Sequence, residues 1–205
     1  MGVLKDCIDN KKTNSVPIWL MRQAGRYLPE FKEIRSKNSN FINLCLNPQL
    51  SKEITLQPIK RFSLDAAIIF SDILIIPFAM GQKVEFEKNF GPKLGNLNID
   101  EIFNVSNNEI LNKLDPIYQL IKITSEDKIL DGKDLIGFVG ATWTLLVYML
   151  NRQSPKKLDK KIYNYKNQDE LIKKIINVQK LHIKNQVENA ASIIQVFDSW
   201  AGLLG

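Results

Sequence analysis

The chain has 205 residues, a formal net charge of +6, 44% hydrophobic residues and 24% charged residues. This composition is typical of a soluble globular protein and argues against a disordered or fibrous chain. The basic residues are scattered, so no nucleic-acid partner is predicted, and the lysines at 156–166 are interpreted as a solvated face. The two cysteines, Cys7 and Cys45, belong to no CxxC or His-containing motif. They predict neither disulfides nor a metal site and fit a reducing, cytoplasmic location.

No membrane segment is predicted. The N-terminus has no apolar signal region. The longest apolar run, at 66–80, is interrupted by Ser71, Asp72 and Pro77 and is shorter than the roughly 20 residues that a span needs.

The pattern of apolar residues predicts alternating strands and helices. In chain order we expect a buried strand at 17–21, a helix at 47–62, a strand at 66–75, a hairpin at 81–97, a helix at 107–126, a strand at 135–141, a helix at 167–190 and a strand at 191–198. Asn47 and Pro48 are suited to the N-cap and first turn of their helix, and Pro116 is expected to break or restart the helix at 107–126.

This alternation is typical of an α/β fold with a parallel sheet. No GxGxxG follows any strand, which argues against a dinucleotide-binding Rossmann domain. We therefore predict a (β/α) barrel, with residues 1–205 belonging to one domain.

Unusual polar residues follow the four predicted strands. They are Arg22, Asp72, Thr142 to Thr144, Asp198 and Ser199. In a barrel the carboxyl ends of the strands form one rim, where the active site is built.

Each of these features also has a structural interpretation. Asp72, in an apolar neighbourhood, either accepts from a nearby backbone N–H or arginine, or receives N–H groups or positive charge from a ligand. Arg22 and Arg26 could cap a helix or pair with Asp72, but Gly25 between them makes a loop on which their guanidinium groups can converge. Converging guanidinium groups favour binding of carboxylates or phosphates.

Three other side chains have both a functional and a structural interpretation. The Tyr148 hydroxyl is either a ligand donor or simply exposed. Ser199 has no triad-type histidine and is interpreted as a hydrogen-bond donor. His182, the only histidine, is expected at the surface or half-buried on its helix.

The segment PIWLMRQAGRYLPEFKEIR resembles the N-terminal signature of uroporphyrinogen decarboxylases. The resemblance continues through LCLNPQLSKEITLQPIKRF, DAAIIFSDILIIPFAMGQKVEF, GFVGATWTLLVYM and IQVFDSWAG, in the family's order. It implies a (β/α)8 barrel, usually a homodimer, that needs no metal or organic cofactor. It also implies removal of the four acetate carboxyl groups of uroporphyrinogen III, giving coproporphyrinogen III for haem synthesis.

The resemblance also implies roles for individual residues. Asp72 would accept the pyrrole N–H groups and stabilise the cation formed on pyrrole protonation. Arg22 would hold a reacting acetate and donate the proton or position its donor, and Arg26 would bind another carboxylate. Tyr148 and Ser199 would donate hydrogen bonds to substrate carboxylates. The backbone around Gln23 and Ala24 would line the cleft.

The chain departs from the family pattern at three points. Thr142 stands where proline is usual, and LNRQSPKK replaces an acidic residue and glycine after Tyr148 and Met149. Only about four βα units are predicted, so we expect an incomplete chain that is inactive alone and prone to aggregate. The alternatives are a cobalamin-dependent methyltransferase on the same barrel, which zinc content would reveal, and a non-catalytic tetrapyrrole-binding fragment.

Overall fold

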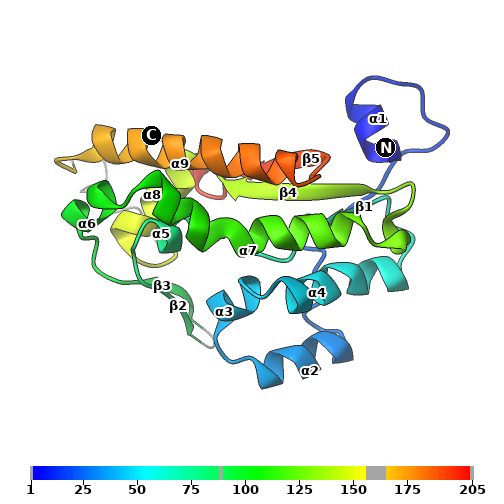
Figure 1. The fold of residues 1–205 in the computed structure, drawn as a ribbon, viewed down its shortest axis with the longest axis horizontal. Helices are drawn as coiled ribbons and strands as arrows, with labels where there is room; N and C mark the ends of the chain where they lie inside the picture. The colour runs from blue at the N-terminus through cyan, green and yellow to red at the C-terminus, as the bar shows by residue number, and fades with distance from the viewer. Residues whose placement is uncertain (1, 88–89, 156–164, 204–205) are drawn as a thin grey trace. The chain divides into compact units, whose positions relative to one another are not determined.

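The computed structural model describes residues 2–87, 90–155 and 165–203; Figure 1 shows the order of its elements. Of the solvated lysine face predicted at 156–166, residues 156–164 lie outside the described residues, and Lys166 is exposed. In chain order the elements are α1 (Val3–Ile8), α2 (Pro29–Lys37), α3 (Phe41–Cys45), α4 (Pro48–Arg61), β1 (Ala66–Ile68), α5 (Ile75–Ala79), β2 (Val84–Glu87), β3 (Gly91–Leu94), α6 (Ile99–Asn104), α7 (Asn107–Ser125), η1 (Lys128–Leu130), β4 (Asp134–Gly140), α8 (Thr142–Asn151), α9 (Gln168–Glu188), β5 (Ile193–Phe197) and η3 (Ala201–Leu203).

The chain divides into two compact units, which are described separately. The first unit contains Met1–Ser71, Pro116–Phe138 and Ile183–Gln195. The second unit contains Asp72–Asp115, Val139–His182 and Val196–Gly205.

A three-stranded sheet with the order β1-β4-β5 carries the α/β pattern. β1 pairs in parallel with β4, from Ala66 opposite Asp134 to Ile68 opposite Ile136. All seven residues of β4 are buried, which is typical of parallel strands covered on both faces. β4 and β5 confirm the strands predicted at 135–141 and 191–198 to within two residues.

In the first unit, α4 begins as its sequence predicts. The Asn47 side chain accepts a hydrogen bond from the Leu50 N–H at 3.1 Å, and Pro48 occupies the first helical position. α4 packs against α2, α3 and β1 (Figure 1).

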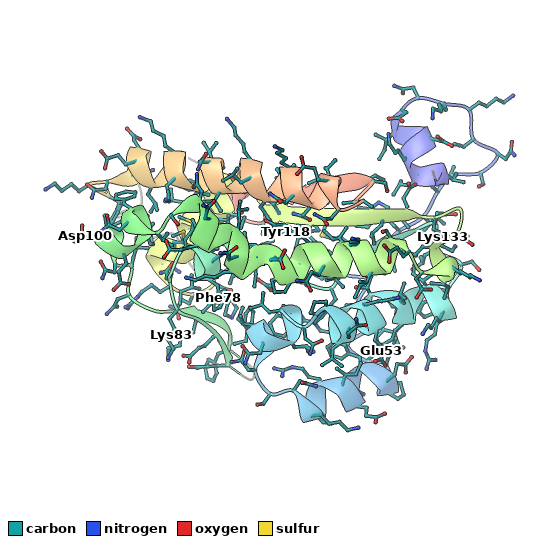
Figure 2. The ribbon with its side chains drawn as sticks, viewed as in Figure 1. Glu53, Phe78, Lys83, Asp100, Tyr118 and Lys133 are labelled. Atoms are coloured by element: carbon teal, nitrogen blue, oxygen red, sulfur yellow. The ribbon has the colours of Figure 1, made fainter. Side chains whose placement is uncertain are left out.

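In the second unit, the predicted hairpin is confirmed. β2 and β3 pair antiparallel, with Val84 opposite Leu94, and Figure 2 labels Lys83 just before β2. The Gln82 side chain fixes the base of the hairpin, because its Nε2 donates to the carbonyls of Gly95 and Met149, each at 3.0 Å.

Two strand predictions were wrong in part. Residues 17–20 form no regular strand, and Ile18, Leu20 and Met21 are 55%, 53% and 62% exposed instead of buried. The segment at 66–75 forms a strand only over Ala66–Ile68, and the turn that follows leads into α5. A run of apolar residues indicates side chains that favour burial, but it does not determine whether the run forms a strand or which part of the chain packs against it.

Two helix predictions also need correction. α7 continues through Pro116, although proline removes one backbone hydrogen bond. Fully buried side chains flank the proline within the helix, among them Leu114 and Ile117, and their packing offsets that loss. The expected surface or half-buried position of His182 on α9 was wrong, because this side chain is only 2% exposed. Burial lowers the pKa of His182 to about 4.

Candidate functional site

The first unit presents the two predicted arginines on one loop. Arg22 and Arg26 are exposed on either side of the buried Gln23. Neither guanidinium group forms an ion pair with the described residues of this unit. Two positive groups without carboxylate partners leave this loop able to bind an anion.

Gln23 ties this loop to β1. Its Nε2 donates to the Ala66 carbonyl at 2.9 Å, and its Oε1 accepts from the Leu20 N–H at 3.1 Å. Both polar atoms of the Gln23 side chain therefore form hydrogen bonds within the fold. At this position the loop can offer a ligand its backbone groups.

Gly25 lies in a tight turn after Gln23. The Arg26 N–H donates to the Ala24 carbonyl at 2.9 Å, and the Leu28 N–H donates to the Gly25 carbonyl at 2.8 Å. A Cβ atom at Gly25 would lie 2.5 Å from the Leu28 side chain, so a larger residue fits only if the buried Leu28 side chain moves.

Arg26 rests on an aromatic side chain. Its guanidinium carbon lies 6.0 Å from the centre of the Phe41 ring, and that of Arg35 lies 5.7 Å from the same ring. Phe41 packs edge-on against Phe70 at 5.7 Å, so this contact places Arg26 on a fixed surface.

Asp72 begins the second unit, in the turn before α5. Its Oδ1 accepts from the Leu74 N–H at 2.9 Å, and its carbonyl accepts from the Ile75 N–H at 3.2 Å. This turn geometry, common for aspartate, orients the half-buried carboxylate.

The other predicted ligand donors meet in the second unit. Tyr148 lies on α8 and packs edge-on against Trp200, with 5.8 Å between the ring centres. Ser199 is exposed in the turn after β5, directly before Trp200. The Ala141 N–H donates to the Phe197 carbonyl at 2.8 Å, which joins the chain before α8 to the end of β5. Of the predicted site residues, Tyr148 and Ser199 are therefore brought to one place.

A polar contact also anchors the start of α8. The Thr142 hydroxyl donates to Gln179 Oε1 at 2.7 Å, and Gln179 Nε2 donates to the Gly140 carbonyl at 2.6 Å. Thr142, the departure from the usual proline, thus binds α9 through its hydroxyl group.

Within 2–87, 90–155 and 165–203, no three His, Cys, Asp or Glu side chains are grouped so as to hold a metal ion. No helix in the same ranges is both long and apolar enough to cross a membrane.

Comparison with known proteins identifies the family. The model of the family "Uroporphyrinogen decarboxylase (URO-D)" matches residues 3–205. The chain belongs to the uroporphyrinogen decarboxylase family. The uroporphyrinogen decarboxylase of Rickettsia felis is 43% identical over 199 residues, which cover 95% of this chain and 57% of that protein. The uroporphyrinogen decarboxylase of Chelativorans sp. is 40% identical over 205 residues, which cover 98% of this chain and 60% of that protein.

The chain spans about three fifths of the length of these uroporphyrinogen decarboxylases. Among solved structures, a methyltransferase from Methanosarcina mazei superposes with a TM-score of 0.73 at 16% identity, covering 97% of this chain and 58% of that one. This likeness concerns the fold alone. Together with the family it confirms the predicted class, an α/β chain with the N-terminal units of a (β/α)8 barrel.

Sequence reasoning did not predict how Ser199 is held. Thr144, Asp198 and Trp200 form hydrogen bonds around it, although Thr144 and Asp198 stood out in the sequence only as polar residues after strands. Strand-end position could have indicated that Thr144 and Asp198 come together, but not which atoms meet.

Proposed function

We propose that the protein is a uroporphyrinogen decarboxylase, which removes the four acetate carboxyl groups of uroporphyrinogen III and yields coproporphyrinogen III. The observation that carries this proposal is the match to the family over residues 3–205. The exposed loop of Arg22 and Arg26 supports it, because a substrate with eight carboxylates needs positive groups that no carboxylate of the same unit already neutralises.

In this proposal Asp72 accepts the N–H groups of the pyrroles. A proton adds to a pyrrole ring before CO2 leaves, and the Asp72 carboxylate stabilises the resulting cation. The turn at Leu74 supports this role, since it orients the carboxylate before substrate arrives. No organic cofactor or metal enters the proposal.

The remaining residues bind carboxylates or line the site. Arg22 holds the reacting acetate and donates the proton or positions its donor, while Arg26 binds a second carboxylate. Tyr148 and Ser199 donate hydrogen bonds to further carboxylates. Gln23 and Ala24 line the cleft through their backbone, in keeping with the buried Gln23 side chain.

The partners proposed are few. Uroporphyrinogen III is the substrate, a second copy of the chain forms a homodimer, and neither nucleic acid nor a membrane is bound. The cytoplasm is the proposed location. Sedimentation of the full polypeptide tests the dimer.

The test replaces Asp72 with asparagine in the full polypeptide that carries this sequence. Decarboxylation of uroporphyrinogen III and binding of uroporphyrin are measured separately. Loss of one preorganised electrostatic group lowers kcat by about 100-fold to 1,000-fold, and we expect binding to be retained. An Asp72→Asn protein with unchanged kcat would refute the role of Asp72, and a wild-type protein without decarboxylase activity would refute the proposed function.

Arg26 has a matched control in Arg35. Both guanidinium groups stack on the Phe41 ring, but only Arg26 belongs to the proposed site. In the same assays, Arg26→Gln is expected to raise the KM for uroporphyrinogen, whereas Arg35→Gln is expected to leave it unchanged. Equal effects would show that the stacking, and not the substrate contact, is what matters.

A further inference from the structure

One buried hydroxyl contacts both neighbours of Ser199. Thr144 Oγ1 donates to Asp198 Oδ1 at 2.6 Å and accepts from the Trp200 N–H at 3.0 Å. Thr144 is fully buried, while Ser199 between its two partners is exposed. Both residues flanking the proposed carboxylate donor are therefore held by one atom.

Thr144 is itself fixed in place. It lies in the first turn of α8, where a β-branched side chain has few rotamers. The preceding residue makes a third contact, since Trp143 Nε1 donates to the Trp200 carbonyl at 2.9 Å. Both backbone polar groups of Trp200 are thus bonded to α8, whereas its buried indole N–H has no partner among the described residues. The backbone of Trp200, not its indole nitrogen, holds this turn.

The same framework carries the second proposed donor. Tyr148 lies one turn further along α8 and packs on Trp200. A change at Thr144 would therefore alter the position of Ser199 relative to Tyr148, and with it the spacing of two donors for substrate carboxylates.

We propose that Thr144 is a positioning residue for substrate binding, which acts by holding the Asp198 carboxylate and the Trp200 backbone N–H so that Ser199 can donate to a carboxylate. This role rests on the proposed decarboxylase function. Thr144 does not touch substrate; its hydroxyl sets the geometry of a residue that does.

A merely structural role for Thr144 predicts different kinetics. If the hydroxyl only stabilised the fold, its loss would reduce the fraction of active protein and so the apparent kcat, with an unchanged KM. If it positions a binding group, its loss raises KM.

The test uses the full polypeptide and four variants, Thr144→Val, Thr144→Ser, Ser199→Ala and the double variant Thr144→Val/Ser199→Ala. Thr124→Val is the matched control, because Thr124 is also fully buried and its hydroxyl donates to the Leu120 carbonyl within the same helix, α7. Steady-state kinetics with uroporphyrinogen III are combined with amide hydrogen exchange at Trp200.

We expect Thr144→Val and Ser199→Ala each to raise KM about tenfold, the size of one hydrogen bond to a charged group. The double variant should also show about a tenfold rise, because both changes remove the same interaction. Thr144→Ser keeps the hydroxyl and should stay within about threefold of the wild type, as should Thr124→Val. The Trp200 amide hydrogen should exchange faster than in the wild type in Thr144→Val, but not in Thr144→Ser, which keeps the hydroxyl acceptor.

Three results would overturn the proposal: a KM for Thr144→Val equal to that of Thr124→Val, a rise in the double variant of about 100-fold, as expected for independent effects, or unchanged exchange at Trp200. Any of these in an active protein refutes the role of Thr144 and leaves the proposed function standing. A wild-type protein without decarboxylase activity refutes both, and that outcome is recognised before any variant is measured.

Discussion

Replacing Gly137 with alanine tests how α9 is held against β4. A methyl group there would overlap Gln186 Oε1 and would lie 3.0 Å from Ile194 Cδ1 and 3.2 Å from Ala191 Cβ. Gln186 is fully buried, accepts from the Phe138 N–H at 2.9 Å and donates to the Phe138 carbonyl at 3.0 Å. The alanine methyl group therefore cannot be accommodated unless Gln186 moves and loses these two bonds.

The size of the effect follows from these contacts. Unsatisfied buried polar groups cost about 1–3 kcal/mol each, and overpacking a core costs about 1–3 kcal/mol. We expect Gly137→Ala to lower the free energy of unfolding of the full polypeptide by about 3 kcal/mol, measured by urea unfolding followed by circular dichroism. Gly202→Ala is the control, because a methyl group there meets nothing within 4 Å; its effect should stay within about 0.5 kcal/mol.

A double-mutant cycle shows whether the Gln186 contact is the cause. Gln186→Ala alone should cost about 2–3 kcal/mol, since it removes two buried hydrogen bonds to the Phe138 backbone. Adding Gly137→Ala should then cost little, because the obstacle is gone. Costs that add within about 0.5 kcal/mol would show that the two residues act independently and would refute this reasoning.

Two further predictions concern a buried histidine and a strained arginine. The pKa of His182 is lowered from 6.5 to about 4 by burial, so the unfolded chain binds a proton at a higher pH than the folded one. His182 therefore makes the free energy of unfolding fall as the pH drops below about 6.5, by about 2 kcal/mol between pH 7 and pH 5. In urea unfolding at several pH values, His182→Gln should lose this part of the pH dependence. A pH dependence equal to that of the wild type would contradict the prediction. Arg152 ends α8 with φ at 61°, a left-handed conformation. Arg152→Gly should raise the unfolding free energy by about 0.5–1 kcal/mol and Arg152→Val should lower it, because only glycine adopts this φ without strain; equal stabilities of the two variants would argue against strain at this position.

Local signals in the sequence predicted local structure well. The Asn47 cap, Pro48 and the hairpin of β2 and β3 depend on neighbouring residues, and all three are present. The strand predicted at 17–21 depends on what covers its apolar side chains, and three of them are more than half exposed. Residues 17–21 have the apolar character of a buried strand, but whether they pair with another strand depends on segments that are distant in the sequence.

The burial of His182 could have been predicted. Leu171, Ile175 and Val178 are fully buried on α9, and the spacing of four and three residues continues to His182 and then to Gln186. The prediction followed the lysines around the histidine and overlooked this stripe. A polar residue on an apolar stripe is buried with the stripe, and its pKa responds to the burial.

Residues that meet a ligand and residues that hold them in place leave different traces in a sequence. Arg22 and Arg26 stand out because unpaired positive charge on a glycine turn suggests an anionic ligand by itself. Thr144 has no such trace, because its partners, Asp198 and Trp200, lie 54 and 56 positions away. That contact exists only in one register of β4 and β5, and a slip by one residue would turn the side chains of β5 to the opposite face. The position of Ser199 is therefore a property of the sheet as much as of the motif in which it lies.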